Sequence, residues 1–259
     1  DLPPDVLAIL ERSAGRESPE LGRDFFNQYL ENARIAAEER MPLCQDTGFA
    51  VLFVELGDRV VFDRGTLYDA LEDGVREGYR KFYLRKSIVT DPLFDRKNTG
   101  DNTPPVVHLR LVPGRSLRIV LAPKGGGSEN MSAVKLLKPS DGRAGVVDFA
   151  VETIRKAGGN PCPPTILGMG IGGTMEKAAL LAKQALLRPV GTPHPEARYA
   201  DLEAEILEKV NATGIGPQGL GGDVTVLAVH IEHFPCHIAS MPVAINLNCH
   251  AARHAEVTL

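Results

Sequence analysis

The feature that most constrains the fold is an apolar run, Phe49–Leu56, which is enclosed by Gly48 and Gly57. Its length is typical of a strand, and the lack of alternation between apolar and polar residues predicts a strand that is buried on both faces. The glycines on either side mark where this strand begins and ends. Amphipathic segments lie before and after the run, so strands and helices are interleaved along the chain.

Apolar residues recur at helical spacing in several segments, the first of which opens with Ser18-Pro19, typical of an N-cap and a first-turn proline. Helices are expected over residues 18–40, 65–82, 142–156, 175–187 and 196–210. Strands are expected over residues 49–56, 106–112, 117–121, 165–168 and 223–231. The second and third of these strands are expected to form a β-hairpin, because Pro113-Gly114-Arg115 lies between them.

Two further segments lack a clear period. Residues 87–105 are rich in turn residues and are expected to form a loop, and residues 235–254 are expected to mix strand and loop. With strands and helices interleaved elsewhere, the predicted class is α/β (mixed α+β), with mixed sheets flanked by helices. A single domain over residues 1–259 is expected.

Composition excludes several classes of protein. The chain has 259 residues, enough to bury a substantial core, and a formal net charge of −4 with no segment that concentrates Lys and Arg. A nucleic-acid-binding surface is therefore not expected. The apolar stretches are too short to cross a membrane, and residues 1–12 carry acids where a signal peptide has basic residues. Four cysteines are too few to staple a chain of this size, so we expect reduced thiols and a cytoplasmic location.

Two glycine-rich segments resemble ligand-binding motifs only in part. Residues 168–173, GMGIGG, fit the G-x-G-x-x-G pattern of dinucleotide-binding domains, but no strand ending in an acid follows at the required distance. Residues 124–130, KGGGSEN, lack the spacing of a P-loop and are expected to form a flexible loop whose backbone could approach a ligand closely. A nucleotide-binding domain therefore stays open as an alternative.

The cysteines show no C-x-x-C spacing, which excludes a zinc ribbon or a ferredoxin motif. Cys44, Cys162 and Cys249 each lie in a turn-like setting, in PLCQDTG, GNPCPPT and NLNCHAAR respectively. Three thiolates on distant loops could converge on one iron–sulfur cluster and leave one iron open to a substrate oxygen. For any single cysteine, a small buried apolar side chain remains the alternative.

Several unusual motifs occur in one order along nearly the whole chain. They are PLCQDTG, GDNTPP, APKGGGSENMS, NPCPPTILGMGIGGTMEKA, GGDVTVL and HIASMPVAINLNCHAARH. Together they resemble the class I, iron–sulfur-dependent fumarase and tartrate dehydratase family. The resemblance is in particular to the α subunit of the two-subunit form, which is equivalent to the amino-terminal domain of the single-chain enzymes.

The resemblance implies a role for particular residues. The ligands of a [4Fe–4S] cluster would be Cys44, Cys162 and Cys249, while Cys236 is not needed as a ligand. The substrate contacts would be Gln45, Asp46, Arg85, Gly126 and His237. Of these, Arg85 would hold a carboxylate, and Asp46 and His237 would be the catalytic pair that organises a hydroxyl or water. Without the resemblance, Arg85 and His237 would be interpreted as a surface charge and a half-buried ring.

The implied activity is the reversible hydration of fumarate to L-malate, with dehydration of L(+)-tartrate as the alternative and a small dicarboxylate as substrate in both cases. The resemblance implies that a further domain or a β subunit completes the family's site, and the chain is expected to need a β subunit. An α2β2 assembly is implied, with self-association of α chains and cluster-binding loops that converge at a subunit interface. A non-catalytic iron–sulfur module is a further alternative, although such a module would be expected to ligate all four irons.

Overall fold

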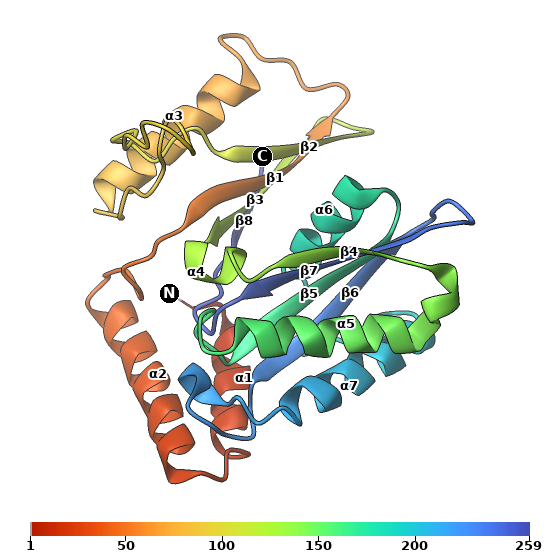
Figure 1. The fold of residues 1–259 in the computed structure, drawn as a ribbon. Coiled ribbons are helices and arrows are strands. Elements are labelled where there is room, and N and C mark those ends of the chain that lie inside the picture. The colour runs from red at the N-terminus through yellow and green to blue at the C-terminus, as the bar shows by residue number, and fades with distance from the viewer. Residues whose placement is uncertain (1) are drawn as a thin grey trace. The chain divides into compact units, whose positions relative to one another are not determined.

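The computed structural model describes residues 2–259, and helices and strands alternate along it as the sequence predicts (Figure 1). Contacts within the chain divide it into two compact units. The small unit comprises Glu39–Gly126 and Arg253–Leu259, and the large unit comprises Leu2–Glu38 and Gly127–Ala252. Each unit therefore combines segments that are distant in the sequence. The single domain expected over the whole chain stays a prediction.

The elements have the following bounds. The helices are α1 (Pro4–Ala14), α2 (Glu20–Glu38), α3 (Leu67–Lys81), α4 (Gly126–Glu129), α5 (Gly142–Ala157), α6 (Met175–Ala185) and α7 (Ala197–Asn211). Short 3₁₀ turns cover Pro139–Asp141 and Pro217–Gly219. The strands are β1 (Phe49–Gly57), β2 (Val106–Val112), β3 (Leu117–Lys124), β4 (Ala133–Leu137), β5 (Thr165–Gly172), β6 (Val226–Phe234), β7 (Met241–Asn248) and β8 (Ala255–Thr258).

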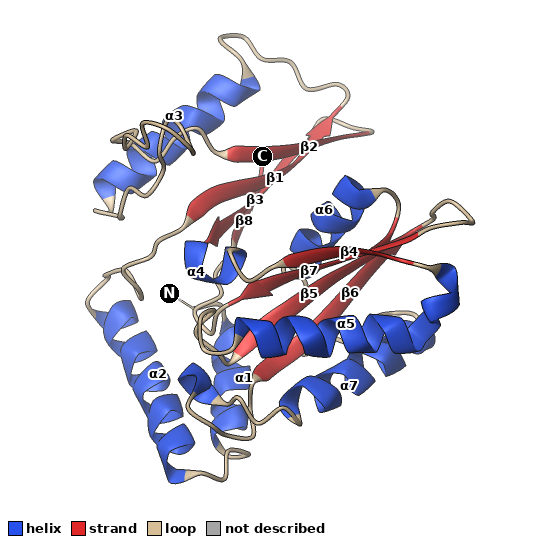
Figure 2. Cartoon of the chain, in the orientation of Figure 1, coloured by secondary structure: helices blue, strands red, loops and turns tan. Residues whose placement is uncertain are grey.

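The sheet of the small unit has the strand order β2-β1-β3-β8 (Figure 2). Strand β1 pairs parallel with β2 and antiparallel with β3, so the β-hairpin expected from residues 106–112 and 117–121 is wrong in its pairing. The connection between β2 and β3 instead crosses the end of β1, where the Gly57 N–H donates to Ser116 O at 2.9 Å. The physical reason is that β1 is the most buried strand of this sheet, and the central position pairs both of its edges.

Helix α3 packs on one face of this sheet. It begins with a capping box, in which Thr66 Oγ1 accepts from the Asp69 N–H at 3.1 Å and the Asp69 carboxylate accepts from the Thr66 N–H at 3.2 Å. The buried residues that join the helix to β1 are Ala50, Leu52, Val54, Leu67, Leu71, Val75 and Tyr79. Apolar residues at helical spacing on α3 therefore meet every second residue of the strand.

The sheet of the large unit has the strand order β4-β7-β5-β6, with β5 parallel to β6 and antiparallel to β7. Helices α5 and α7 cover one face of it, and α6 packs on the other face with α1 and α2 (Figure 1). Alternate residues of β5 serve the two layers, since Leu167 and Met169 belong to the core with α5 and α7, whereas Ile166 faces α1 and α2.

Helix α6 approaches this sheet closely because β5 has glycines beneath it. A Cβ on Gly168 would lie 2.2 Å from Ala182 O, and a Cβ on Gly170 would lie 2.0 Å from Ala178 O. The strand expected over residues 165–168 therefore continues through the glycine motif. These glycines allow α6 to pack closely on β5. This packing explains the glycine motif without a bound phosphate.

Other differences from the expected elements are small. The sequence patterns do not predict α1, α4, β4 or β8, each of which is short or too weakly periodic to recognise alone. The α/β class with mixed sheets flanked by helices is confirmed. In residues 2–259, no helix combines the length and apolar character needed to cross a membrane.

The glycine packing makes a testable prediction. Gly170→Ala should lower the free energy of unfolding by about 2 kcal/mol, because its methyl group would collide with the backbone of α6. Gly74→Ala in α3 is the matched control, since nothing lies within 4 Å of the added Cβ. Alanine in a helix is favoured over glycine by about 0.5–1 kcal/mol, so the control should be slightly stabilised. Urea unfolding of both variants measures this, and equal stabilities would contradict the packing role.

Candidate functional site

The first cysteine loop lies in the small unit, where residues 44–48 lead directly into β1. The buried phenol of Tyr79 on α3 donates to Thr47 O at 3.0 Å and to Gly48 O at 2.8 Å. Asn102 Nδ2 also donates to Gly48 O, at 3.2 Å. Burial raises the pKa of Tyr79 to about 12, so the phenol keeps its proton and remains a donor. The backbone after Cys44 is therefore fixed by hydrogen bonds from two side chains, Tyr79 and Asn102.

The carboxylate of Asp46 is engaged by backbone N–H groups. Its Oδ1 accepts from the Gly48 N–H at 3.1 Å, and its Oδ2 accepts from the Gly126 N–H at 2.8 Å. Asp46 and Gly126, which are far apart in the sequence, are thus brought together. Gly48 has a positive φ of 82°, and a Cβ there would lie 2.7 Å from Lys124 N, so only glycine fits.

Gln45 and Arg85 lie beside the same loop. The Cys44 thiol donates to Gln45 Oε1 at 3.2 Å, and Thr47 Oγ1 donates to Arg85 O at 3.0 Å. The backbone of Arg85 is therefore hydrogen-bonded to the cysteine loop, and Arg85 as a whole is exposed to solvent. The small unit thus gathers five of the predicted site residues: Cys44, Gln45, Asp46, Arg85 and Gly126.

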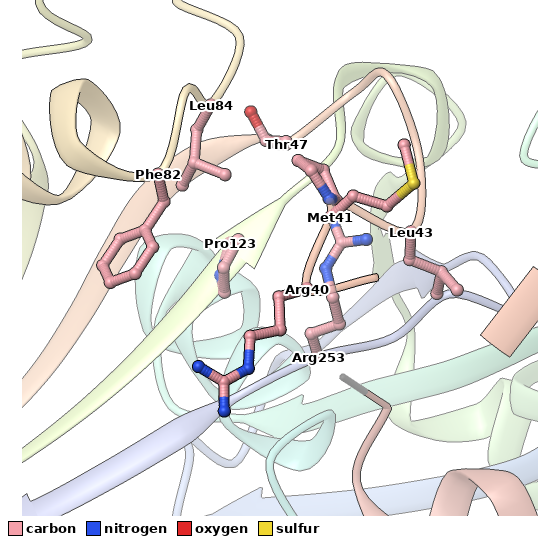
Figure 3. Close-up of a pocket in the computed structure, with 9 residues that line it drawn as sticks. Arg40, Met41, Leu43, Thr47, Phe82, Leu84, Pro123 and Arg253 are labelled. Carbon is pink, nitrogen blue, oxygen red and sulfur yellow. The ribbon is translucent and has the colours of Figure 1, made fainter. Parts of the chain in front are cut away.

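A cavity of about 450 Å³ lies next to this loop in the small unit. Its walls include the apolar side chains of Met41, Leu43, Phe82 and Leu84, together with two arginines, Arg40 and Arg253. Figure 3 shows the Arg253 side chain extending toward Thr47 and Met41, whereas the Arg40 guanidinium points the other way.

Arg253 is a site residue that the sequence interpretation did not identify. Its guanidinium donates to Asp46 O at 3.2 Å, so it supports the cysteine loop directly. The sequence feature that could have indicated Arg253 is its position four residues after Cys249 in NLNCHAARH. This motif was interpreted only for its cysteine.

The other two predicted ligands, Cys162 and Cys249, lie in the large unit. Cys162 precedes β5 and Cys249 directly follows β7. Because these strands are antiparallel, with Ile166 opposite Asn248, the start of one and the end of the other share one end of the sheet. His250 Nδ1 lies 3.0 Å from Cys162 O, so the two cysteine loops meet. Cys162 has a left-handed φ of 54°, a strained geometry for a non-glycine residue that recurs at functional sites.

Tyr29 of α2 contacts both the loop that contains Cys162 and the loop that contains Cys249. Its ring stacks on His250 with 4.1 Å between centroids, and its hydroxyl donates to Pro163 O at 3.3 Å. Gln218 Nε2 in turn donates to the Tyr29 hydroxyl at 2.8 Å. Burial raises the pKa of Tyr29 to about 12, so it is a neutral phenol at ordinary pH. In the sequence Tyr29 is simply one member of an apolar helical stripe, and nothing there distinguishes it from core.

His237 does not lie with Cys162 and Cys249. It belongs to the loop between β6 and β7, at the opposite end of the sheet from these cysteines (Figure 1). Strand β7 alone has eight residues, so His237 and Cys249 are separated by about 23 Å at roughly 3.3 Å per residue. Cys236, its neighbour, lies in the same loop. The sequence could not show this separation, because the twelve residues from His237 to Cys249 could equally form a compact loop.

Cysteine pairing and metal geometry add two observations. None of the four cysteines forms a disulfide in this structure. Within the described residues, 2–259, no group of three or more His, Cys, Asp or Glu side chains is arranged to hold a single metal ion.

Comparison with known proteins gives the family. Residues 1–258 match the family described as "Fumarate hydratase (Fumerase)". The chain belongs to this family. The resemblance inferred from the motifs is thereby confirmed, and with it the enzyme class: this member of the fumarate hydratase family is a hydro-lyase.

Two proteins of known name are similar in sequence to this member of the fumarate hydratase family. A "Putative L(+)-tartrate dehydratase subunit alpha" from Methanocaldococcus jannaschii is 44% identical over 98% of this chain and 90% of the relative. An "L(+)-tartrate dehydratase subunit alpha" from Escherichia coli is 37% identical over 99% of this chain and 87% of the relative. The names of both relatives fit the α-subunit assignment.

The support for the first cysteine loop can be tested with Tyr79→Phe. Removing the hydroxyl leaves two buried carbonyl oxygens with one donor fewer, which should lower the free energy of unfolding by about 1–3 kcal/mol. Tyr68→Phe on the same helix is the control, because Tyr68 is exposed and its change should stay within about 0.5 kcal/mol. Chemical denaturation of the two variants gives the comparison, and a Tyr79→Phe variant as stable as the control would contradict the proposed support.

Proposed function

We propose that the chain is the α subunit of a [4Fe–4S]-dependent hydro-lyase, which hydrates fumarate to L-malate reversibly together with a β subunit. The observation that carries the proposal is the family match over residues 1–258, combined with site residues gathered around the cysteine loops. The names of the relatives, which call each an α subunit, support a β partner for this chain as well. An α2β2 assembly with self-associating α chains is part of the proposal.

The cysteines fit the proposed cluster. Thiolates are the usual ligands of iron–sulfur clusters, and Cys162 and Cys249 lie on loops that His250 joins. Cys44, on a loop held by Tyr79 and Asn102, would be the third ligand. Cys236 lies at the far end of the large sheet and cannot share a cluster with Cys162 and Cys249. Since the ligands must be reduced thiolates, we infer a cytoplasmic location.

The bound cluster would supply a Lewis-acidic iron with an open coordination position. The chain's own residues would bind and orient the dicarboxylate. Arg85 is exposed beside the cysteine loop, and its guanidinium can form a bidentate pair with one carboxylate. The Gln45 amide would add a hydrogen bond, and Gly126 would let the substrate approach the backbone, since it has no side chain.

Asp46 would act at the hydroxyl of the substrate. Hydration of fumarate and its reverse move a proton at a carbon next to a carboxylate, while the hydroxyl or water must be held in position. Each Asp46 oxygen accepts one backbone N–H, so each keeps a further lone pair that can accept from this hydroxyl. The backbone contacts fix where the carboxylate points, which suits a group that must orient a small polar substrate.

The second candidate substrate is L(+)-tartrate, which the names of the relatives favour. L-Malate, the hydrated form of fumarate, and L(+)-tartrate each offer two carboxylates to the same arginine and differ in one hydroxyl, so discrimination depends on one or two hydrogen bonds. A nucleotide-binding role is disfavoured, because the glycines of GMGIGG lie within β5 and are occupied by packing against α6. A non-catalytic iron–sulfur module would need a fourth ligand, which Cys236 cannot provide.

The activity test uses this chain, its β partner, and the two combined under anaerobic conditions. Only the combination should hydrate fumarate, and the chain alone should be at least about 10²-fold slower because groups that stabilise the transition state are missing. Fumarate and L(+)-tartrate are assayed side by side, with a larger kcat/KM expected for fumarate. Comparable turnover by the chain alone would contradict the need for β, and preference for tartrate would make that acid the substrate.

The ligand assignment is tested in the same complex. Serine at position 44, 162 or 249 should each abolish bound iron, sulfide and the brown colour of the anaerobic protein, because each thiolate holds one corner of the cluster. Cys236→Ser is the matched control and should retain full iron and sulfide. Loss of iron in Cys236→Ser, with retention in any of the other three variants, would overturn the assignment.

A further inference from the structure

The first cysteine loop has three successive carbonyl oxygens that each accept a hydrogen bond from a side chain. Tyr79 donates to the carbonyl oxygens of Thr47 and Gly48. The carbonyl oxygen that precedes them, Asp46 O, accepts from Arg253 Nη2 at 3.2 Å. Unlike the phenol, the guanidinium is charged, and hydrogen bonds from a charged donor are the stronger ones. The peptide group next to the Asp46 side chain is therefore held by a charged donor.

The sheet of the small unit places Arg253 at this loop. Strand β8 pairs antiparallel with β3, and its first residue, Ala255, lies opposite Leu121. Strand β3 pairs antiparallel with β1, with Lys124 opposite Phe49, the first residue of β1. The residues just before β8 and the loop just before β1 therefore lie at the same end of β3. Strand pairing fixes the backbone two residues after Arg253, so its side chain extends from a rigid element.

The guanidinium of Arg253 makes few contacts besides this one. Among residues 2–259 it has no carboxylate partner, and Asp46 O is its one hydrogen-bond acceptor. The residue is half-buried and lines the cavity of about 450 Å³, where its side chain extends toward the loop (Figure 3). Burial is the main cause that raises the pKa of Tyr79, while the charge of Arg253 lowers it and the charge of Asp46 raises it. Both charged groups thus lie near the same hydroxyl.

Arg253 contacts the backbone of Asp46 and leaves its carboxylate free. The carboxylate reaches forward to accept from the Gly48 N–H, a local turn that requires one particular backbone conformation. The peptide group between Asp46 and Thr47 is planar, so a donor that holds its carbonyl oxygen fixes the rotation of the whole group. The hydrogen bond from Arg253 therefore stabilises the turn on which the direction of the Asp46 carboxylate depends.

We propose that Arg253 is a positioning residue for Asp46: its hydrogen bond to Asp46 O keeps the backbone turn in which the carboxylate faces the hydroxyl of the substrate. The inference rests on the proposed function, in which Asp46 holds that hydroxyl or a water. Without Arg253 the peptide group after Asp46 can rotate, and the carboxylate leaves its orientation for part of the time. The step that moves the hydroxyl is then slowed, whereas binding of the substrate carboxylates, assigned to Arg85, is little affected.

The activity test compares Arg253→Met with Arg40→Met in the complex with the β partner. Each change removes a guanidinium from the wall of the same cavity, but the Arg40 guanidinium points away from the loop (Figure 3). Arg253→Met should lower kcat about 10- to 100-fold, as expected when a reacting group is misplaced by about 1 Å, with KM within about threefold of wild type. Arg40→Met should keep the kcat of wild type.

Three results would overturn the positioning role. The first is an equal kcat in Arg253→Met and Arg40→Met. The second is a raised KM at unchanged kcat in Arg253→Met, because Arg253 would then bind the substrate directly. The third is a loss of iron and sulfide from Arg253→Met, because Arg253 would then act on cluster binding. The proposal expects full iron and sulfide in both variants.

Chemical rescue separates the lost contact from a general disturbance of the fold. Arg253→Ala opens space in the wall of the cavity, which a methylguanidinium ion can enter. At concentrations far below those that unfold proteins, this ion should raise the kcat of Arg253→Ala by about tenfold and leave wild type unchanged. Sodium chloride at the same ionic strength should restore nothing. Arg253→Lys, which keeps a charged donor on a shorter side chain, should be intermediate. Absence of rescue, with Arg253→Lys as slow as Arg253→Met, would overturn the proposal.

Hydrogen exchange tests the contact independently of activity. In the full chain the Gly48 N–H, which donates to Asp46 Oδ1, should exchange about tenfold faster in Arg253→Met than in wild type, because the turn opens more often. Mass spectrometry of a peptide that covers residues 45–50 measures this, and Arg40→Met should match wild type. Unchanged exchange in Arg253→Met would overturn the positioning role. A wild-type complex that binds its cluster but hydrates neither acid would instead overturn the proposed function, and the exchange result would still decide whether Arg253 holds the loop.

Discussion

The antiparallel pairing of β5 with β7 is the constraint on which the site in the large unit depends. Cys162 precedes one strand and Cys249 follows the other, so this pairing brings two cysteines that are far apart in the sequence to the same end of one sheet. The same pairing sends the β6–β7 loop to the opposite end. One register therefore joins two predicted ligands and separates both from His237, and no side-chain rearrangement within the sheet could undo that separation.

Two buried tyrosines make the cysteine loops rigid. Tyr79 donates to two carbonyl oxygens of the first loop, and Tyr29 stacks on His250 and donates to Pro163 O beside the second. Burial raises the pKa of each to about 12, so both remain donors. Phenols are well suited to this task, because one end packs in the core while the hydroxyl fixes a loop backbone. Rigid loops keep ligand and substrate groups within the narrow tolerances that catalysis requires.

The sequence predicted what depends on local patterns and missed what depends on tertiary pairing. Periodicity identified the main helices, and the apolar run before Gly57 identified the central strand of the small sheet. The hairpin was wrong because the choice of partner for β1 is made by burial of the whole strand, which a turn motif cannot show. Gly170 belongs to a segment that resembles a nucleotide-binding motif, yet glycine is needed there because the backbone of α6 lies close to it. This contact exists only in the folded chain. Arg253 and Tyr29 were missed since each acts through a contact with a distant loop.

The exposure of the site residues explains why the catalytic unit should be an assembly. Cys162 and Arg85 are exposed, and in water a guanidinium–carboxylate pair is worth at most about 1 kcal/mol. The same pair becomes stronger when neighbouring surfaces exclude water and lower the local dielectric constant. A site whose groups lie on open surfaces of one chain can gain this effect only from partners that cover it. Association and catalytic competence are then linked, since each surface that binds also removes water from the charges that act on the substrate.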